Sequence, residues 1–292
     1  MIPRTWGALL GDVNDYLKSD RTAIPTGLPT IDALTRGGFR AGHVALLVGR
    51  TGVGKSFLAG QIAVNVAKQG KLVGFSSLEM SKEEVAIRCA SALFKDSIED
   101  AEQRFIGSDL GLMGLKHLSI DDTPKPDFLE MAKWVNEVQE LYGQKMDLVV
   151  IDHLKLLRRY SKSFSEAERV ARLSEDAKSF AKQAGVAVLC VHQVGRNEGD
   201  KKNHGDIPLS LESMMYGGEQ DADYALGVYR PALNPSLSAT DRQLVDREVC
   251  LQLLKNRHGP QRLDPIPLVW QKPSAYMYEA EFSEPEEEVD YL

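Results

Sequence analysis

The stretch VGRTGVGKSFLAGQ, residues 48–61, is the strongest indication of the fold class of this 292-residue chain. It places a glycine-rich turn between an apolar, strand-like segment at 44–48 and a helix-like segment at 57–67. The turn satisfies the phosphate-binding pattern GxxxxGK[ST], and it lies after a strand and before a helix, as that pattern requires. The residues that match are Gly49, Gly54, Lys55 and Ser56.

The chemistry of this loop predicts a nucleoside triphosphate as the ligand. Glycines let backbone N–H groups turn inward around the β-phosphate, and the N-terminus of the following helix adds its dipole. Lys55 neutralises oxygens of the β- and γ-phosphates, and the Ser56 hydroxyl reaches Mg²⁺. The loop residues expected to bind the nucleotide are Gly49, Arg50, Thr51, Gly52, Val53, Gly54, Lys55 and Ser56.

Apolar strand-like segments alternate with helix-like segments from residue 43 onward. This alternation predicts an α/β fold, with a mainly parallel, twisted sheet and helices on both faces. The last three strand-like segments come without long helices between them, so we expect antiparallel strands at the C-terminal end. The predicted strands are 43–48, 71–77, 117–122, 147–152, 186–191, 222–230, 248–256 and 266–271.

Three parts of the chain differ in composition. Residues 1–22 contain a predicted amphipathic helix over 5–19, which suits packing on its own core or on a neighbouring subunit. Residues 23–275 form the predicted α/β domain. Residues 276–292 end in the acidic run SEPEEEVDYL, which predicts a disordered tail.

Composition indicates a soluble protein of ordinary type. Hydrophobic residues make up 43% of the chain, and no apolar run approaches the roughly 20 residues that cross a bilayer. The start of the chain is interrupted by charge too early for a signal peptide. We therefore expect a cytoplasmic protein without a membrane partner. The net charge of −7 argues against a generally basic surface but allows a local basic channel.

Two carboxylates follow predicted core strands. Asp152 ends the strand-like DLVVID, at the edge where open α/β sheets place their ligands, and its carboxylate suits the Mg²⁺ shell. Glu79, in SSLEMS, lies just past another strand. A glutamate there suits activation of a water molecule or the first turn of the next helix, and spacing does not choose between these roles.

Seven segments together resemble the RecA-like ATPase domain of the DnaB-type replicative helicases, whose members include stand-alone phage proteins. The resemblance runs in family order from Ile24 to Pro260. SLEMS, EQDAD and KNRHGP are its most diagnostic parts. The segments are IPTGLPTIDALTRGGFRAGHVALLVGRTGVGKS, FSSLEMS, LSIDDTP, DLVVIDHLKLL, AKSFAKQAGVAVLCVHQVGR, GGEQDADYALGVYRP and LLKNRHGP.

The resemblance implies roles for five residues. Glu79 is similar to the catalytic glutamate that activates the attacking water, Asp152 to the Walker B aspartate, and Gln193 to the sensor of the γ-phosphate. Lys255 and Arg257 are similar to a basic pair that reaches into the neighbouring subunit's ATP site. It further implies ATP and Mg²⁺ as cofactors, a ring that is most often a hexamer, and single-stranded DNA in its channel.

Two loops are expected to face that channel, and their basic residues suit contacts to phosphates without reading of sequence. The loop after the Gln193 strand carries the main expected DNA contacts, Arg196, Lys201 and Lys202. The loop after the Asp152 strand carries Lys155, Arg158, Arg159 and Lys162.

Two departures from the family keep other functions open. The loop core is Thr-Gly-Val, where those helicases usually have Pro-Ser-Met, and LESMMYGG lacks the arginine that usually precedes EQDAD. The leading hypothesis is a ring-forming ATPase that translocates on single-stranded DNA and unwinds duplex in replication, with replication or recombination proteins as further partners. The alternatives are a recombination or repair ATPase without processive unwinding, and an ATP-gated assembly or loading factor.

Overall fold

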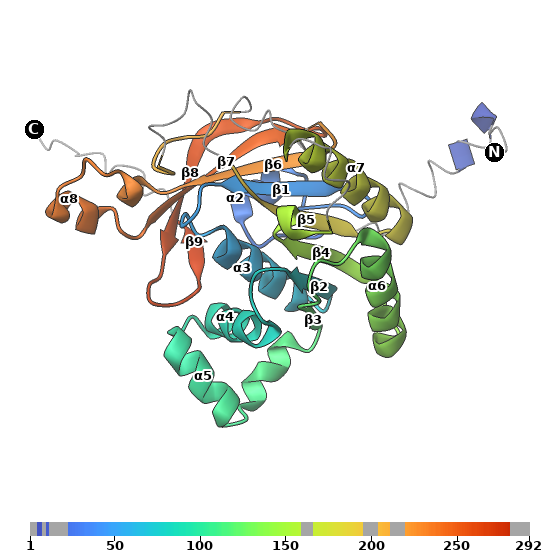
Figure 1. Cartoon of the computed structure of the whole chain (residues 1–292), viewed down its shortest axis with the longest axis horizontal. Helices are drawn as coiled ribbons and strands as arrows, with labels where there is room; N and C mark the ends of the chain where they lie inside the picture. The colour runs from blue at the N-terminus through green and yellow to red at the C-terminus, as the bar shows by residue number, and fades with distance from the viewer. Residues whose placement is uncertain are drawn as a thin grey trace, which may run out of the picture.

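The computed structural model describes residues 23–158, 166–194, 204–210 and 220–280, together with 5–7 and 10–11. A nine-stranded sheet, in the order β3-β2-β4-β5-β1-β6-β7-β8-β9, crosses the molecule, and helices lie on both sides of it (Figure 1). Of the N-terminal helix expected over 5–19, residues 6–7 and 10–11 are helical and residue 5 is not, whereas 8–9 and 12–19 lie outside the described residues. Among the described residues, none of the helices combines the length and apolarity needed to span a bilayer.

The first six strands pair in parallel, as predicted. Every residue of β1, which leads into the phosphate-binding loop, and of β2 is buried, because helices cover both faces of the sheet. The parallel strands are β1 (Val44–Gly49), β2 (Leu72–Ser77), β3 (Leu118–Asp121), β4 (Met146–Asp152), β5 (Ala187–Gln193) and β6 (Tyr224–Tyr229).

Three antiparallel strands complete the sheet at its other end, which confirms the expected change of direction. They are β7 (Glu248–Asn256), β8 (Arg262–Trp270) and β9 (Met277–Glu279). The predicted domain boundary at 275 is wrong, because β9 pairs with β8 and Met277 is fully buried. Gln61 binds both backbone polar groups of Met277, so this strand belongs to the domain. The predicted disordered tail from 281 onward lies outside the described residues.

Two apolar cores lie on the two faces of the sheet, since successive residues of a strand point to opposite faces. Ala45 and Leu47 of β1 join the core under α2, α3 and α4, whereas Leu46 and Val48 join the core under α6 and α7. The helices of the first face are α2 (Pro29–Leu34), α3 (Lys55–Ala67) and α4 (Lys82–Phe94). Those of the second face are α6 (Phe128–Tyr142) and α7 (Glu166–Ala184).

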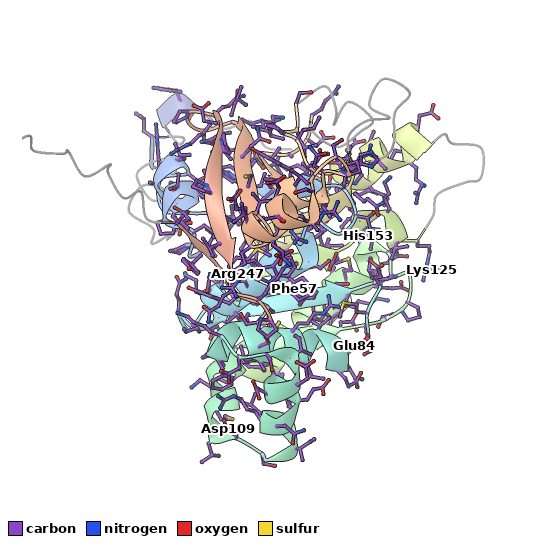
Figure 2. The ribbon with its side chains drawn as sticks, turned by 90° about the vertical axis from the view of Figure 1, so that its left-hand side faces the viewer. Phe57, Glu84, Asp109, Lys125, His153 and Arg247 are labelled. Atoms are coloured by element: carbon purple, nitrogen blue, oxygen red, sulfur yellow. The ribbon has the colours of Figure 1, made fainter. Side chains whose placement is uncertain are left out.

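A small helical lobe extends from the first face, at the bottom of Figure 1. It contains α4, α5 (Ile98–Ile106) and the 3₁₀ helix η1 (Leu110–Leu115). Figure 2 places Asp109 at the far end of this lobe and Phe57 and His153 near the middle of the molecule. The remaining short elements are η2 (Leu154–Leu156), η5 (Pro231–Leu233) and α8 (Ala239–Leu244).

Candidate nucleotide-binding site

The carboxyl ends of four adjacent parallel strands, β2, β4, β5 and β1, bring the predicted site residues together. The register pairs Gly49 with Gln193 and Ser77 with Asp152. Leu78 N–H donates to the Asp152 carbonyl (2.7 Å), which carries the segment leading to Glu79 alongside Asp152. The sheet therefore gathers its ligand-binding groups at the edge where open α/β sheets bind their ligands.

The glycines of the loop permit its tight path. Gly54 has φ +100°, and a Cβ there would lie 2.9 Å from Cε of Met277 and 3.3 Å from Cζ3 of Trp270. A side chain at this position would therefore be both strained and blocked. The helix α3 begins directly after Gly54, which is its N-cap and has no side chain to cap the first N–H groups. These N–H groups are thus available for an anion such as a phosphate.

The buried Lys55 ammonium is poised for a negatively charged ligand. Its Nζ donates to the Arg50 carbonyl (2.7 Å). Burial lowers the pKa of Lys55 to about 8, although the nearby carboxylates of Asp152 and Glu79 act in the opposite direction. Because desolvation disfavours the charged amine, an added phosphate charge would stabilise its protonated form.

The pKa of Asp152 is shifted in the opposite direction from that of Lys55. Burial raises the pKa of its carboxyl, and a hydrogen bond with Ser56 only partly offsets this. A cation next to the carboxylate would stabilise its charged form. Ser56 and Asp152 offer hard oxygen ligands of the kind that Mg²⁺ prefers, and they lie beside the lysine that suits phosphate. The residues at this site therefore fit Mg²⁺ with a nucleoside triphosphate.

Glu79 lines the same pocket, which has a volume of about 200 Å³. Spacing left open whether Glu79 instead belongs to the start of the next helix, and the structure shows which residues cap that helix, α4. Ser81 is the N-cap of α4, and it exchanges hydrogen bonds with Glu84 in a capping box. Because Ser81 and Glu84 cap this helix, the Glu79 side chain is not needed for that purpose and faces the pocket beside Lys55 and Asp152.

Gln193 contacts the phosphate-binding loop directly. Its Nε2 donates a hydrogen bond to Thr51 Oγ1 (2.6 Å). The amide therefore links the end of β5 to the loop. Amide groups suit such a role because they both donate and accept hydrogen bonds without a change of charge.

One wall of the pocket is aromatic, and the sequence reasoning missed it. Phe57 and Trp270 have ring centroids 5.0 Å apart, and the guanidinium of Arg88 lies 4.7 Å from the Phe57 centroid. The guanidinium of Arg230 lies 5.2 Å from the Trp270 centroid. Such surfaces suit a flat nucleobase. The phosphate motif carries no signal for Trp270, which reaches the pocket through the antiparallel strand β8.

Lys255 and Arg257 lie near the amino-terminal ends of the parallel strands, whereas the phosphate-binding loop lies at their carboxyl ends. The register pairs Gly49 with Val228 of β6, and Tyr224, at the other end of β6, with Asn256. The basic pair is therefore about one strand length, roughly 15 Å, from the phosphate-binding loop of its own chain. The structure thus separates these two predicted site residues from the other catalytic candidates.

Most residues expected to contact DNA lie outside the described residues, namely Arg196, Lys201, Lys202, Arg159 and Lys162. Arg158, from the loop after β4, is described and is bound to acidic partners. Its guanidinium forms ion pairs with Asp127 (2.9 Å) and Glu130 (2.8 Å). These contacts tie Arg158 to the start of α6.

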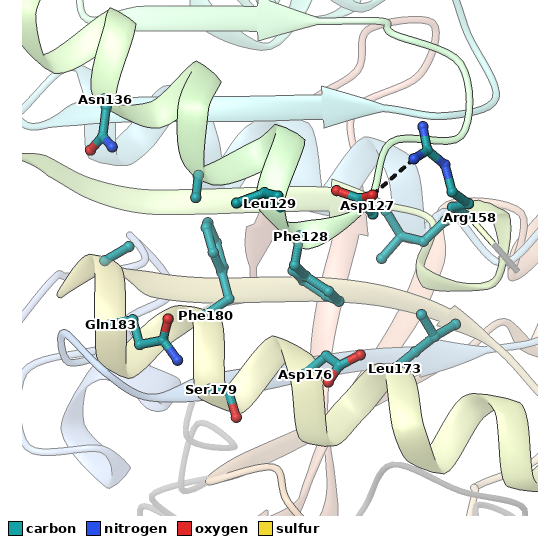
Figure 3. Close-up of a pocket in the computed structure, with 13 residues that line it drawn as sticks. Asp127, Phe128, Leu129, Asn136, Arg158, Leu173, Asp176, Ser179, Phe180 and Gln183 are labelled. Carbon is teal, nitrogen blue, oxygen red and sulfur yellow. Dashed lines mark hydrogen bonds and ion pairs between the residues drawn. The ribbon is translucent and has the colours of Figure 1, made fainter. Parts of the chain in front are cut away.

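A second hollow, of about 620 Å³, lies between α6 and α7 (Figure 3). Phe128 and Phe180 pack against each other inside it, with ring centroids 5.6 Å apart, and the ion pair between Asp127 and Arg158 borders it. It lies under the second face of the sheet and shares no residue with the nucleotide pocket.

The fold and the phosphate-binding site together define an α/β protein of the P-loop class. The chain belongs to the family of the DnaB-like helicase C terminal domain, whose sequence profile matches residues 23–278. This confirms the resemblance stated from the motifs.

Individual relatives agree with this assignment. The chain is 28% identical over 263 residues to the replicative DNA helicase DnaB of Leifsonia xyli subsp. xyli, and the match covers 85% of this chain and 54% of that protein. It is 31% identical over 222 residues to a probable plasmid replicative DNA helicase of Chlamydia psittaci, with 71% and 46% covered. The chain thus spans about half the length of the curated relatives it matches.

Solved structures confirm the fold class. One solved ATPase domain superimposes with a TM-score of 0.75 at 21% identity, over 96% of this chain and all of that domain. A KaiC-like protein from Pyrococcus horikoshii superimposes with a TM-score of 0.58 over 88% of this chain and 98% of its own length, at 17% identity. The architecture is therefore shared with proteins whose sequences have diverged widely.

Proposed function

We propose that this chain is an Mg²⁺-dependent ATPase that assembles into a hexameric ring and translocates on single-stranded DNA to unwind duplex during replication. One observation carries the proposal. Glu79, Asp152 and Gln193 meet the phosphate-binding loop at one end of the sheet, whereas Lys255 and Arg257 lie at the other. A ring places opposite ends of neighbouring chains together, so that each ATP site is completed by a second subunit.

Within one chain, each residue of the pocket has a distinct task. The loop from Gly49 to Ser56 binds the phosphates through its backbone N–H groups and Lys55. Ser56 and Asp152 would hold Mg²⁺, which when bound neutralises charge on the β- and γ-phosphates. Glu79 orients the attacking water and accepts its proton. Gln193 detects the γ-phosphate. When ATP binds, its amide forms a hydrogen bond with the γ-phosphate in place of the one with Thr51.

The neighbouring subunit supplies Lys255 and Arg257. Positive charge delivered in trans stabilises the charge that develops during phosphoryl transfer, and is worth several orders of magnitude in rate in related mechanisms. This makes hydrolysis depend on assembly. A chain that cannot bring its own Lys255 and Arg257 to its own loop is expected to turn over ATP slowly as a monomer.

DNA would lie in the centre of the ring and contact Arg196, Lys201 and Lys202 through its phosphates. Because such contacts release counterions, affinity for single-stranded DNA should fall steeply with salt and depend little on base sequence. Replication or recombination proteins are the further partners that we propose. One solved relative, a DnaB-like replicative helicase, is described together with its interactions with primase. We place the protein in the cytoplasm.

One feature of the loop favours a second candidate function. Thr51 lies where the helicases usually have proline, and it holds Gln193 through a side-chain hydrogen bond that proline would not form. This supports a recombination or repair ATPase that is stimulated by DNA without processive unwinding. The third candidate, an ATP-gated assembly or loading factor, is less favoured because Glu79 faces the pocket beside Lys55 and Asp152.

The test is ATPase activity measured with and without single-stranded DNA on a sample whose oligomer mass is known, alongside a fork-unwinding assay. DNA-stimulated turnover by a ring together with strand displacement supports the leading proposal. Stimulated turnover without displacement supports the second candidate. Nucleotide-driven assembly with negligible turnover supports the third and contradicts the role given to Glu79.

A further inference from the structure

The motif EQDAD lies beside the basic pair, and the proposed function does not use it. Its described part, residues 220–223, leads into β6 and lies next to the end of β7. The Gln220 carbonyl accepts hydrogen bonds from Lys255 Nζ (3.2 Å) and from Arg257 Nη2 (2.7 Å). The Arg257 backbone N–H donates to the Asp223 carbonyl (2.9 Å). Lys255 and Arg257 therefore both form hydrogen bonds to the segment 220–223.

The two carboxylate oxygens of Asp223 face different parts of the molecule. Oδ2 is anchored to the domain core, since it accepts hydrogen bonds from Lys178 of α7 and from the Val44 N–H (2.9 Å) at the start of β1. Oδ1 faces the basic segment, 3.7 Å from Arg257 Nη1 and 3.4 Å from His258 Nε2. The Asp223 side chain is only 3% exposed, whereas that of Arg257 is 45% exposed. The buried carboxylate of Asp223, which is fixed to the domain core, thus holds the more exposed guanidinium of Arg257.

A metal ion does not explain this cluster, although ligand atoms of His43, Asp223 and His258 lie within 4.8 Å of one another. The two imidazole rings are stacked, with centroids 4.4 Å apart and planes 12° apart. Their lone pairs lie in nearly parallel planes and do not converge on one point. The Lys178 ammonium is already paired with Asp223, so an added cation would also meet like charge.

His43 instead supports the segment by stacking against His258. Burial lowers the pKa of His43 to about 4, although Asp223 acts in the opposite direction, so His43 is uncharged at neutral pH. Its Nδ1 lies 3.2 Å from the Tyr224 hydroxyl, which fixes the ring on which His258 stacks. The residue next to Arg257 is therefore held by stacking, while Arg257 itself faces Asp223.

We propose that Asp223 is a positioning residue, which presents Arg257 to the ATP bound by the neighbouring subunit. The inference rests on the proposed role of Lys255 and Arg257 in trans. Catalysis by a positioned charge depends on its placement, and errors of about 1 Å cost up to roughly a hundredfold in rate. Anchoring Arg257 through its backbone and its guanidinium reduces the freedom it must lose when it meets the phosphate.

The first variant is Asp223→Asn, which keeps the size of the side chain. In the assembled protein we expect kcat to fall roughly ten- to a hundredfold. KM for ATP should stay within about twofold, because the loop residues that bind the phosphates are unchanged and Arg257 acts on charge that develops in the transition state. Asp223→Glu keeps the charge that Lys178 requires, moves the carboxylate by one methylene, and serves as the variant that is easier to fold. Wild-type kcat in either folded, assembled variant would overturn the proposal.

Rings that contain two different variants distinguish a positioning role of Asp223 in the neighbour's site from damage to the ATP site of the altered chain itself. The partner is the Glu79→Gln variant, whose own site is inactive but whose Arg257 is intact. If Asp223 acts on the neighbour, this partner restores turnover at the sites of Asp223→Asn subunits. Absence of rescue, with Arg257→Ala subunits rescued in parallel, overturns the role of Asp223 and leaves the shared site intact. Absence of rescue for both variants shows that the proposed trans arrangement has failed.

A double variant provides a second measurement that does not depend on mixing. If Asp223 acts through Arg257, then Asp223→Asn combined with Arg257→Ala has the same kcat as Arg257→Ala alone, because the two positions share one function. A further loss of about tenfold in the double variant would mean that Asp223 acts elsewhere, and would also overturn the proposal.

Discussion

Gln193 Nε2 and Thr51 Oγ1 lie 2.6 Å apart, so a side-chain hydrogen bond joins the end of β5 to the phosphate-binding loop. Thr51 occupies the position at which the related helicases usually have proline. The bond gives this chain a direct link between the candidate sensor and the loop.

Replacing Gln193 with alanine is expected to uncouple ATP hydrolysis from DNA. The variant loses the amide that contacts Thr51 and, by our proposal, the γ-phosphate, but it retains Lys55 and the rest of the loop. We expect stimulation of ATPase by single-stranded DNA to be largely lost while ATP affinity changes little. The measurement is steady-state turnover across a DNA titration. Gln243→Ala, an exposed glutamine on α8, is the matched control and should respond like wild type.

Replacing Glu79 with glutamine is expected to block hydrolysis but not binding. The amide keeps the size of the side chain and removes its ability to accept a proton from water. Turnover should fall by roughly a hundredfold or more, as is typical when a general base is lost. Glu83→Gln, an exposed glutamate on α4, provides the control. Normal turnover in Glu79→Gln would remove this residue from the mechanism.

The lowered pKa of Lys55 predicts proton uptake when ATP binds. Without ligand, burial lowers this pKa to about 8, so the amine loses its proton as pH rises through that value. Phosphate charge favours the protonated amine and raises its pKa again. Between about pH 8 and 10, binding should therefore take up protons and weaken as pH rises. Calorimetry at about pH 8.5 in buffers of different ionisation enthalpy measures this uptake, and binding enthalpies that do not depend on the buffer would contradict it.

The same shift has a consequence for stability. Lys55 has a lower pKa in the folded chain than its ordinary value of 10.5, so above about pH 8 the unfolded chain binds more protons. The Lys55 contribution therefore favours unfolding at neutral pH, and this penalty is relieved as pH rises through that window. Lys55→Met removes the titrating group. The difference in free energy of unfolding between wild type and Lys55→Met should shrink as pH rises from about 7 to 10.

Trp270 is expected to bind the nucleobase. Stacking on an aromatic side chain is worth about 1–3 kcal/mol, so Trp270→Ala should weaken ATP binding by roughly tenfold or more, while Trp270→Phe retains most of the affinity. Because Trp270 also packs on Phe57, thermal unfolding must be measured in parallel. Affinity for inorganic triphosphate, which has no base, is the internal control. An equal loss for triphosphate and ATP would assign Trp270 to folding alone.

The sequence predicted those parts of the site that depend on local pattern. The loop from Gly49 to Ser56 and the strand that ends at Asp152 carry their own signals of glycine spacing and apolar runs. The alternation of strands and helices implies parallel strands, whose carboxyl ends share one edge of the sheet, so Asp152 is expected at the same edge as the loop, whereas the strand order that brings them together is known only from the structure. The apolar run before Gln193 likewise predicts that this residue lies at the end of a strand.

Other features depend on long-range topology, which local pattern does not encode. Trp270 is more than two hundred residues from Gly54 in the chain and reaches it because the sheet turns antiparallel after β6. The same turn carries Met277 under the loop, so the predicted end of the domain fell too early. The role of Glu79 was open from sequence because the capping box at Ser81 and Glu84 is visible only once hydrogen bonds are known.

We propose that two subunits share each ATP site, with Glu79 from one and Arg257 from the other. The most direct measurement is the ATPase activity of co-assembled Glu79→Gln and Arg257→Ala subunits, each of which should be inactive alone. Mixing is expected to restore turnover, because Arg257→Ala sites receive an intact arginine from their Glu79→Gln neighbours. Mixed rings whose activity equals the average of the two separate variants would contradict it.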